Sequence, residues 1–191
     1  MRTGPSEGAL RILGIDPGSQ VTGFGVLERL DGEVVHVAHG TVHAGPETSV
    51  ARRLDRLYRA LCEIIEAHRP DVASVEQVFV ARSARAALVL GQARGVALAA
   101  VGAAGLPVHE YAPTRIKQSV TGNGRAAKLQ VQRVVRRQLG LAATPAPDAA
   151  DALAAALCHA QAGRISQLGV RSRPRPRRRA SAPVVRVRRA P

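Results

Sequence analysis

The sequence predicts a domain of the α/β class, in which helices flank a mixed β-sheet. Short apolar runs bounded by Gly, Pro and Asp are typical of strands. Longer segments repeat apolar residues every three or four positions, which is typical of helices that bury one face. The two kinds of segment follow one another in the order βββαβαβααα. No internal repeat and no second domain boundary is visible.

Five segments have the composition of strands. The first three follow one another closely and are joined by tight turns of Gly, Pro, Ser and Asp, which predicts an antiparallel meander. The fourth and fifth are separated by a long helical segment. The expected strands span residues 11–16, 21–29, 34–43, 71–77 and 107–111.

The helical segments lie between and after these strands. Apolar residues from Val50 to Ile65 follow the spacing of one helix face, and Pro70 limits that helix. A second segment is rich in Ala, Leu and Val with interior glycines, which suits a long helix packed closely against another element. This second helix is expected at residues 84–104. Three further helices are expected at 113–120, 126–138 and 147–162.

The positive charge is concentrated at one end of the chain. The 191 residues carry a net charge of +14, and the ten arginines after residue 163, with no acid among them, account for +10 of it. We therefore divide the chain into an extension (1–10), a folded domain (11–163) and a disordered basic tail (164–191). Such a tail attracts a phosphate backbone regardless of sequence; the alternative is that its composition only adds solubility.

Composition excludes several classes of protein. Cys62 and Cys158 are too few for a disulfide framework or a cysteine-rich zinc site. The start of the chain has no apolar region of a secretory signal, and the apolar stretches are interrupted before the roughly 20 residues of a membrane span. We expect a cytoplasmic protein with an anionic partner and no membrane.

Four carboxylates occupy positions that point to a metal site. Asp16 and Glu76 end two apolar strands, and Asp148 and Asp151 lie three residues apart at the start of the last helix. Buried acids are unfavourable unless a cation neutralises them. Clustered oxygen ligands without cysteine favour a hard cation, and Mg²⁺ is the usual choice.

Each acid also has an ordinary structural explanation when taken alone. Asp148 follows a proline and is suited to capping a helix. Asp16 precedes Pro-Gly and is suited to a turn. Glu76 is harder to explain, because its neighbours have the composition of a strand interior. The combination therefore carries more weight than any single member.

Four segments in this order resemble one family. The chain is similar to the RuvC-type Holliday-junction resolvases over about residues 11 to 163. The segments are LGIDPGSQVTGFG (13–25), VEQVFVARSARAALVLGQARG (75–95), GNGRAAKLQV (122–131) and DAADALAAALCHA (148–160).

The resemblance implies a ribonuclease-H-like fold with a five-stranded mixed sheet flanked by helices. It also implies a homodimer that binds a four-way DNA junction and nicks two opposing strands symmetrically. The family is expected to work beside the RuvA–RuvB branch-migration complex. Carried over, the catalytic, metal-binding acids are Asp16, Glu76, Asp148 and Asp151.

The resemblance also assigns basic and aromatic residues. The only two lysines of the chain, Lys117 and Lys128, fall on positions where the family has lysines that act in the active site and contact DNA. Phe79 matches an aromatic residue that stacks on an unpaired base, a contact worth about 1–3 kcal/mol per base. Without the resemblance, Phe79 would be assigned to the core. Arg82 and Arg85 follow it in a loop and are candidate DNA contacts.

The expected mechanism uses two Mg²⁺ ions per site, for which Mn²⁺ can substitute. One ion activates a water, the other stabilises the leaving 3′ oxygen, and the lysines stabilise the developing charge. The products are a 5′-phosphate and a 3′-hydroxyl.

Two other enzyme classes are alternatives. A ribonuclease H does not explain VEQVF and LGQARG, and a sugar kinase or actin-like ATPase needs a longer chain. A junction-binding module that does not cut has no need of four acids.

Overall fold

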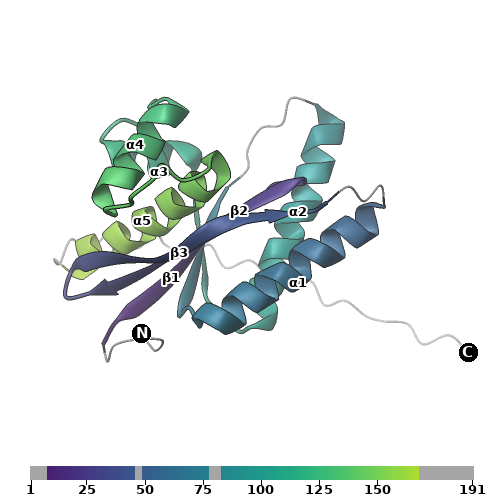
Figure 1. Ribbon diagram of the computed structural model, residues 1–191, viewed down its shortest axis with the longest axis horizontal. Coiled ribbons are helices and arrows are strands. Elements are labelled where there is room, and N and C mark those ends of the chain that lie inside the picture. The colour runs from purple at the N-terminus through teal and green to yellow at the C-terminus, as the bar shows by residue number, and fades with distance from the viewer. Residues whose placement is uncertain (1–7, 46–48, 78–82, 168–191) are drawn as a thin grey trace, which may run out of the picture.

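The computed structural model describes residues 8–45, 49–77 and 83–167, and the side chains as far as residue 162. The predicted order of strands and helices is confirmed (Figure 1). The last helix is longer than expected, so residues 164–167, which sequence analysis placed in the tail, are helical. The elements are β1 (Leu10–Asp16), β2 (Val21–Leu30), β3 (Glu33–His43), α1 (Val50–His68), β4 (Val72–Glu76), α2 (Ala84–Ala103), β5 (Val108–Tyr111), α3 (Pro113–Thr121), α4 (Lys128–Gln138) and α5 (Pro147–Gln167).

The five strands form one mixed sheet in the order β3-β2-β1-β4-β5, which confirms the predicted five-stranded mixed sheet. The first three strands pair antiparallel, and β4 pairs parallel with both β1 and β5. Because β1 and β4 run in the same direction with Ile15 opposite Val75, their carboxyl ends meet at one edge of the sheet. This edge carries the next residue of each strand, Asp16 and Glu76.

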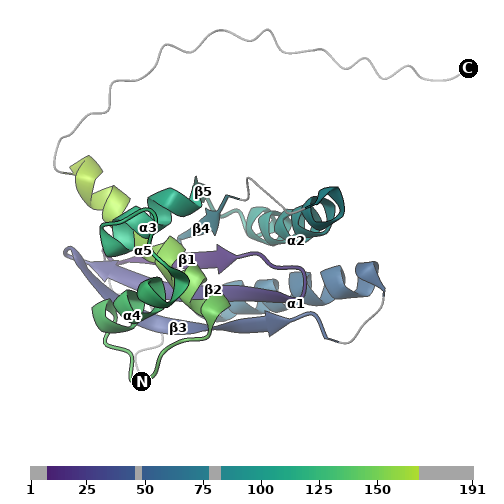
Figure 2. The same cartoon turned by 90° about the horizontal axis from the view of Figure 1, so that it is seen from above.

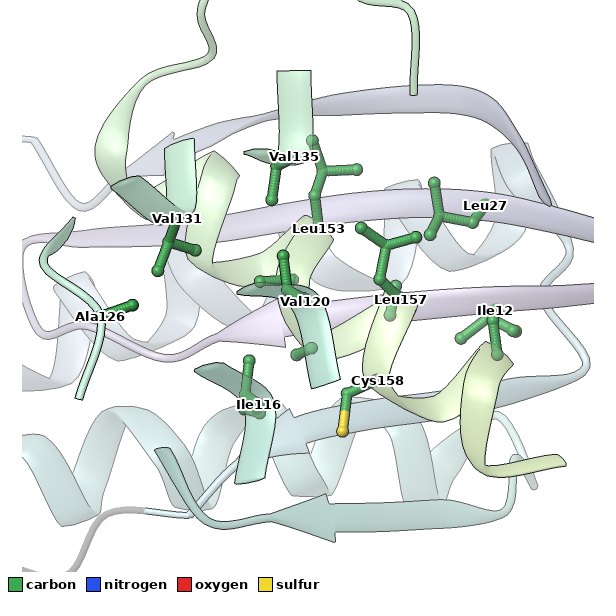
Figure 3. Close-up of a cluster of buried hydrophobic side chains, with 14 of the residues drawn as sticks. Ile12, Leu27, Ile116, Val120, Ala126, Val131, Val135, Leu153, Leu157 and Cys158 are labelled. Atoms are coloured by element: carbon green, nitrogen blue, oxygen red, sulfur yellow. The ribbon is translucent and has the colours of Figure 1, made fainter. Parts of the chain in front are cut away.

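The two faces of the sheet are covered by different helices (Figures 1 and 2). Ile12 and Leu27 pack with residues of α3, α4 and α5, and Figure 3 shows these side chains meeting Leu153 and Leu157 of α5. On the other face, Leu13 and its neighbours on β1, β2 and β4 pack with α1 and α2. The alternation of side chains along β1 therefore divides the core into two layers.

Glycines let α5 lie directly against the backbone of β1 and β2. A Cβ added to Gly14 would meet the carbonyl oxygen of Ala152 at 2.0 Å, and one added to Gly23 would meet the carbonyl oxygen of Asp148 at 1.9 Å. α5 contributes mostly alanines to this contact, including the buried Ala149 and Ala152. Small residues on both sides allow a close backbone approach, which sets the position of the first turn of α5.

Arg11 connects three elements near the start of β1. Its backbone N–H donates to Asp71 Oδ2 at 2.7 Å, and its guanidinium donates to the carbonyl oxygen of His68, the last residue of α1, at 2.8 Å. The same guanidinium pairs with Glu28 of β2 at 2.5 Å, with both side chains largely buried. Arg11 therefore links β1, β2 and the carboxyl end of α1.

α2 corrects one expectation about composition. By length and apolar character this helix is long enough to cross a membrane, although we expected no segment to reach that limit. Its alanines at positions 93, 97 and 100 are buried against the rest of the fold, and Arg94 pairs with Glu110 of β5. Leu88 on its outer side is 65% exposed. Length and composition alone do not separate such a helix from a membrane span.

Candidate active site

Three separate elements bring the four predicted acids to one end of the sheet. Asp16 ends β1 and Glu76 ends β4, while Asp148 and Asp151 lie in the first turns of α5. The backbone of Asp148 lies directly against Gly23 of β2. Gly23 is paired with Asp16 in the β1–β2 ladder, so Asp148 and Asp16 come close together. All four acids are partly buried. The structure therefore gathers residues that are 135 positions apart between Asp16 and Asp151.

The acids repel one another electrostatically. Burial, together with the charges of Glu76, Asp151 and Asp148, raises the pKa of Asp16 from 3.8 to about 7, against the opposing charge of Lys128. Burial and the charge of Asp151 also raise the pKa of Glu76, against the opposing effects of Lys117 and Lys128. A group of carboxylates that resist ionisation in one place is favourable only when a cation shares the site.

Lys128 provides one such cation. Its ammonium lies 2.9 Å from Oδ2 of Asp151, with the lysine side chain 54% exposed and the aspartate 23% exposed. Burial lowers the pKa of Lys128, but the hydrogen bond to Asp151 and the charges of the surrounding aspartates outweigh burial and raise it. The second lysine, Lys117 of α3, lines the same cavity of about 160 Å³ as Glu76, Lys128 and Asp151. Both predicted lysines are therefore at the acid cluster.

The loop between α3 and α4 determines where Lys128 begins its helix. Gly122 ends α3 in the left-handed conformation with φ of 76°, which L side chains rarely adopt. The hydroxyl of Thr121 accepts from the backbone N–H of Asn123, and Gln118 accepts from that of Gly124. This turn leads directly to the first turn of α4, so the ammonium of Lys128 reaches across to α5.

The donor set suits a hard divalent cation. As placed here, the side chains of the described residues form no ready group of three or more His, Cys, Asp or Glu ligands around one point. The cation among the acids is the Lys128 ammonium. The four carboxylates offer oxygen ligands and excess negative charge, which are the properties that Mg²⁺ requires. Metal binding then needs the carboxylates to converge and Lys128 to release Asp151.

Of the three remaining predicted site residues, the structure describes only Arg85. Phe79 and Arg82 lie outside the described residues. Arg85 is exposed in the first turn of α2, which Ser83 caps by accepting from the N–H of Ala86. Glu110, a nearby strand acid, pairs with Arg94 rather than with the acid cluster.

Sequence reasoning missed the glycines that set the geometry. Gly14, Gly23 and Gly25 were part of the motif that carried the family resemblance, yet their role as a contact surface for α5 was not foreseen. Gly23 and Gly25 occupy alternate positions of β2, and Gly14 is paired with Gly25 on β1. Glycines placed in this way on paired strands indicate that another backbone approaches the sheet closely. The ion pair between Lys128 and Asp151 was also not foreseen, because it joins two helices.

The fold and the site define a class of protein. A mixed sheet of this order, with acids at the ends of β1 and β4 and at the start of the last helix, is the arrangement of the ribonuclease-H-like nucleases. Residues 12–159 match the family described as crossover junction endodeoxyribonuclease RuvC. The chain belongs to the RuvC family, whose members are metal-dependent nucleases.

Individual relatives agree with this assignment. The RuvC protein of Alkalilimnicola ehrlichii is 58% identical over 149 residues, which are 78% of this chain and 90% of the relative. The RuvC protein of Geobacter metallireducens is 47% identical over 159 residues, covering 83% of this chain and 97% of the relative. These matches span nearly all of each relative, so the comparison concerns the whole enzyme.

Solved structures agree in fold. RuvC of T. thermophilus in complex with a Holliday junction substrate superposes with a TM-score of 0.76 at 35% identity, covering 82% of this chain and 96% of that one. The yeast mitochondrial Holliday junction resolvase superposes with a TM-score of 0.60 at 14% identity, covering 80% and 78%. The second likeness shows that the fold is shared.

Proposed function

We propose that this chain resolves Holliday junctions in recombination and DNA repair. It binds a four-way DNA junction as a homodimer and nicks two opposing strands symmetrically, leaving 5′-phosphate and 3′-hydroxyl ends. The observation that carries the proposal is the cluster of Asp16, Glu76, Asp148 and Asp151 beside two lysines. A RuvC relative of 35% identity in complex with a junction substrate supports the choice of DNA.

The four acids are proposed to hold two Mg²⁺ ions, and Mn²⁺ can replace them. When bound, these ions activate the attacking water and stabilise the leaving oxygen of a phosphodiester. The elevated pKa of Asp16, which reflects burial and the neighbouring carboxylates, is the property of a site that requires a cation. Partial burial at this edge lowers the local dielectric constant, which strengthens the electrostatic interactions among these groups.

Lys117 and Lys128 act on the phosphate. Both line the cavity that Glu76 and Asp151 share, so their ammonium groups are within the site where charge develops on the scissile phosphate. Lys128 pairs with Asp151 in the absence of substrate, and a phosphate oxygen offers an alternative partner once the acids bind metal. Lys117 comes to the same cavity from α3.

Other parts of the chain are proposed to hold the junction. Phe79 stacks on an unpaired base near the centre, and Arg82 and Arg85 contact phosphates beside it. The basic tail adds sequence-independent attraction to DNA. The outer side of α2, with Leu88 exposed, is proposed to contact α2 of a second copy, because two matched nicks need two active sites. The RuvA–RuvB complex is the proposed partner, and the cytoplasm is the proposed compartment.

A synthetic mobile four-way junction tests the proposal. The wild-type protein is incubated with it in the presence and absence of Mg²⁺, beside Asp16→Asn. We expect paired symmetric nicks that require Mg²⁺ and are absent in Asp16→Asn, while junction binding is retained in the variant. Binding by the wild type without cutting, across divalent metals and junction sequences, would instead identify a junction-binding module.

A further inference from the structure

The histidines of β3 meet in a way that their spacing in the sequence does not suggest. Nε2 of His36 lies 2.7 Å from Nδ1 of His39, and the two rings are arranged edge to face with centroids 4.8 Å apart. Residues three apart on a regular strand point to opposite faces of the sheet. A local irregularity is therefore needed to bring these rings together.

A β-bulge supplies it. His39 pairs with Gly25 and His36 pairs with Leu27, and the register shifts between Val26 and Leu27, so that β3 has one extra residue, Val37. Gly25 and Leu27 are two apart on β2 and face the same way, so their partners do too. Bulges of this kind re-aim side chains, and here the bulge places both imidazoles on the face of the sheet that α5 covers.

We propose that His36 and His39 form a bidentate site for a divalent transition metal of the Cu²⁺ or Ni²⁺ type, separate from the carboxylate cluster. Two nitrogen ligands at right angles about a metal, with bonds of about 2.0–2.1 Å, lie about 2.9 Å apart. The observed separation of 2.7 Å is close to this value. The nitrogen that donates this hydrogen bond carries a proton, which moves through solvent to the other nitrogen of the same ring. Both facing nitrogens then have a free lone pair, and a rotation of one ring exchanges the hydrogen bond for two metal bonds.

The chemistry of the pair suits such a metal. Metal ligation requires neutral imidazole, and burial together with the neighbouring His39 lowers the pKa of His36. Both rings are half-buried, so less side-chain freedom is lost on binding. Imidazole nitrogen favours Cu²⁺ and Ni²⁺, whereas Mg²⁺ prefers the oxygens of the acid cluster.

Three of the other four histidines have contacts that make them less suitable. His159 and His109 also contact one another, but their rings are tilted by 36° with centroids 4.4 Å apart, and Nδ1 of His159 lies 2.8 Å from the Tyr111 hydroxyl. His43 is exposed at the end of β3 and contacts Thr41. In the described residues, no third His, Cys, Asp or Glu completes a group with the pair, so water occupies the other coordination positions.

Metal titration of the full chain in excess Mg²⁺ tests the proposal. We expect one Cu²⁺ per chain, with nitrogen couplings in its electron paramagnetic resonance spectrum. Because even indirect partners of a metal ligand change affinity by 10–100-fold, His36→Gln and His39→Gln should each weaken Cu²⁺ binding at least about tenfold. His43→Gln and His109→Gln, the matched controls, should bind as the wild type does.

A second measurement does not depend on the variants folding. In the wild-type protein, Cu²⁺ below one equivalent should broaden the imidazole proton resonances of His36 and His39 before those of His109 and His159. Equal affinity in His36→Gln, His39→Gln and the wild type overturns the proposal. Broadening that begins at His109, or a copper spectrum without nitrogen couplings, also overturns it.

Discussion

The Lys128 ammonium lies 2.9 Å from Oδ2 of Asp151, so a residue of α4 neutralises an acid of α5 at the centre of the candidate active site. Lys128 is also attracted by Asp148 and Asp16. The interaction gives the acid cluster a cation of its own in the absence of metal. A metal ion bound at the proposed site would compete with Lys128 for Asp151.

Replacing this lysine should make the protein more dependent on metal. For Lys128→Gln we expect a loss of about 0.5–1 kcal/mol of stability without divalent ions, a modest value because the lysine is more than half exposed. Added Mn²⁺ should then raise the melting temperature of the variant more than that of the wild type. Thermal unfolding in chelator measures the loss of stability, and thermal unfolding in Mn²⁺ measures the effect of the metal. If the variant and the wild type had equal melting temperatures in chelator, the proposed counter-ion role would be contradicted. The control is Arg59→Gln, which removes an exposed cation of α1 that pairs with Asp55 and not with the acid cluster.

Gly14→Ala should separate α5 from β1. The added Cβ would lie 2.0 Å from the carbonyl oxygen of Ala152, and because this atom belongs to the backbone it cannot rotate away. We expect a loss of about 3 kcal/mol or more, at the upper end for overpacking, together with loss of DNA cutting. Urea unfolding measures the stability.

Gly102→Ala is the matched control, because a Cβ there meets nothing within 4 Å. This variant should stay within about 1 kcal/mol of the wild type, in line with helix propensity. If Gly14→Ala were as stable as Gly102→Ala, the close approach of α5 would not be needed for the fold.

Arg11→Met should destabilise the junction of β1, β2 and α1. It removes a largely buried ion pair with Glu28 and the hydrogen bond to the His68 carbonyl oxygen. Breaking a buried pair at one partner costs about 3–5 kcal/mol, and we expect a value near the lower end. Arg59→Met removes an exposed pair with Asp55 and should change stability by no more than about 0.5 kcal/mol. Chemical denaturation compares the two, and similar losses would contradict the structural role of Arg11.

His159 should make the protein less stable as the pH falls below neutral, and this effect opposes that of Asp16, whose raised pKa of about 7 favours the folded state over the same range. Burial lowers the pKa of His159 from 6.5 to about 4, assisted by the charges of His109 and Arg29. Between these two values His159 binds more protons in the unfolded chain than in the folded chain, so its contribution to stability falls as the pH falls. Because His159 is only half-buried, we discount the full effect and expect about 1–2 kcal/mol.

Denaturation across that pH range measures the effect. Compared with the wild type, His159→Asn should lose less stability, or gain more, as the pH falls from 6.5 to about 4, while Asp16, His36 and His68 still contribute to the slope. His43→Gln should keep the wild-type slope. An unchanged slope in His159→Asn would show that His159 is not the group that titrates.

The order of elements was predictable because periodicity is a local property of the sequence. The five strands and five helices occur where the apolar patterns indicated, and Asp16 and Glu76 end their strands as expected. The order of strands in the sheet was not predicted, because pairing between distant segments leaves no local pattern; the family resemblance implied only a five-stranded mixed sheet. The end of α5 was misjudged, since alanine, arginine and glutamine continue a helix as readily as they form a tail.

The contacts within the site were less predictable. The pair of Lys128 and Asp151 joins two helices, and its distance depends on how deeply α5 sits on the sheet. The contact between His36 and His39 was not foreseen, because a bulge is decided by the partner strand as well as by β3. The roles of Phe79 and Arg82 stay predictions, as both lie outside the described residues.

The contact of Gly14 and Gly23 with α5 has a consequence for how this enzyme tolerates change. The separation between the acids of the sheet and those of α5 is set by main chain resting on main chain. Substitutions among the larger apolar residues, such as Leu153 or Leu157, alter stability while leaving that separation nearly constant. The relative position of the proposed metal-binding acids therefore depends on a few glycines that have no side chain to vary.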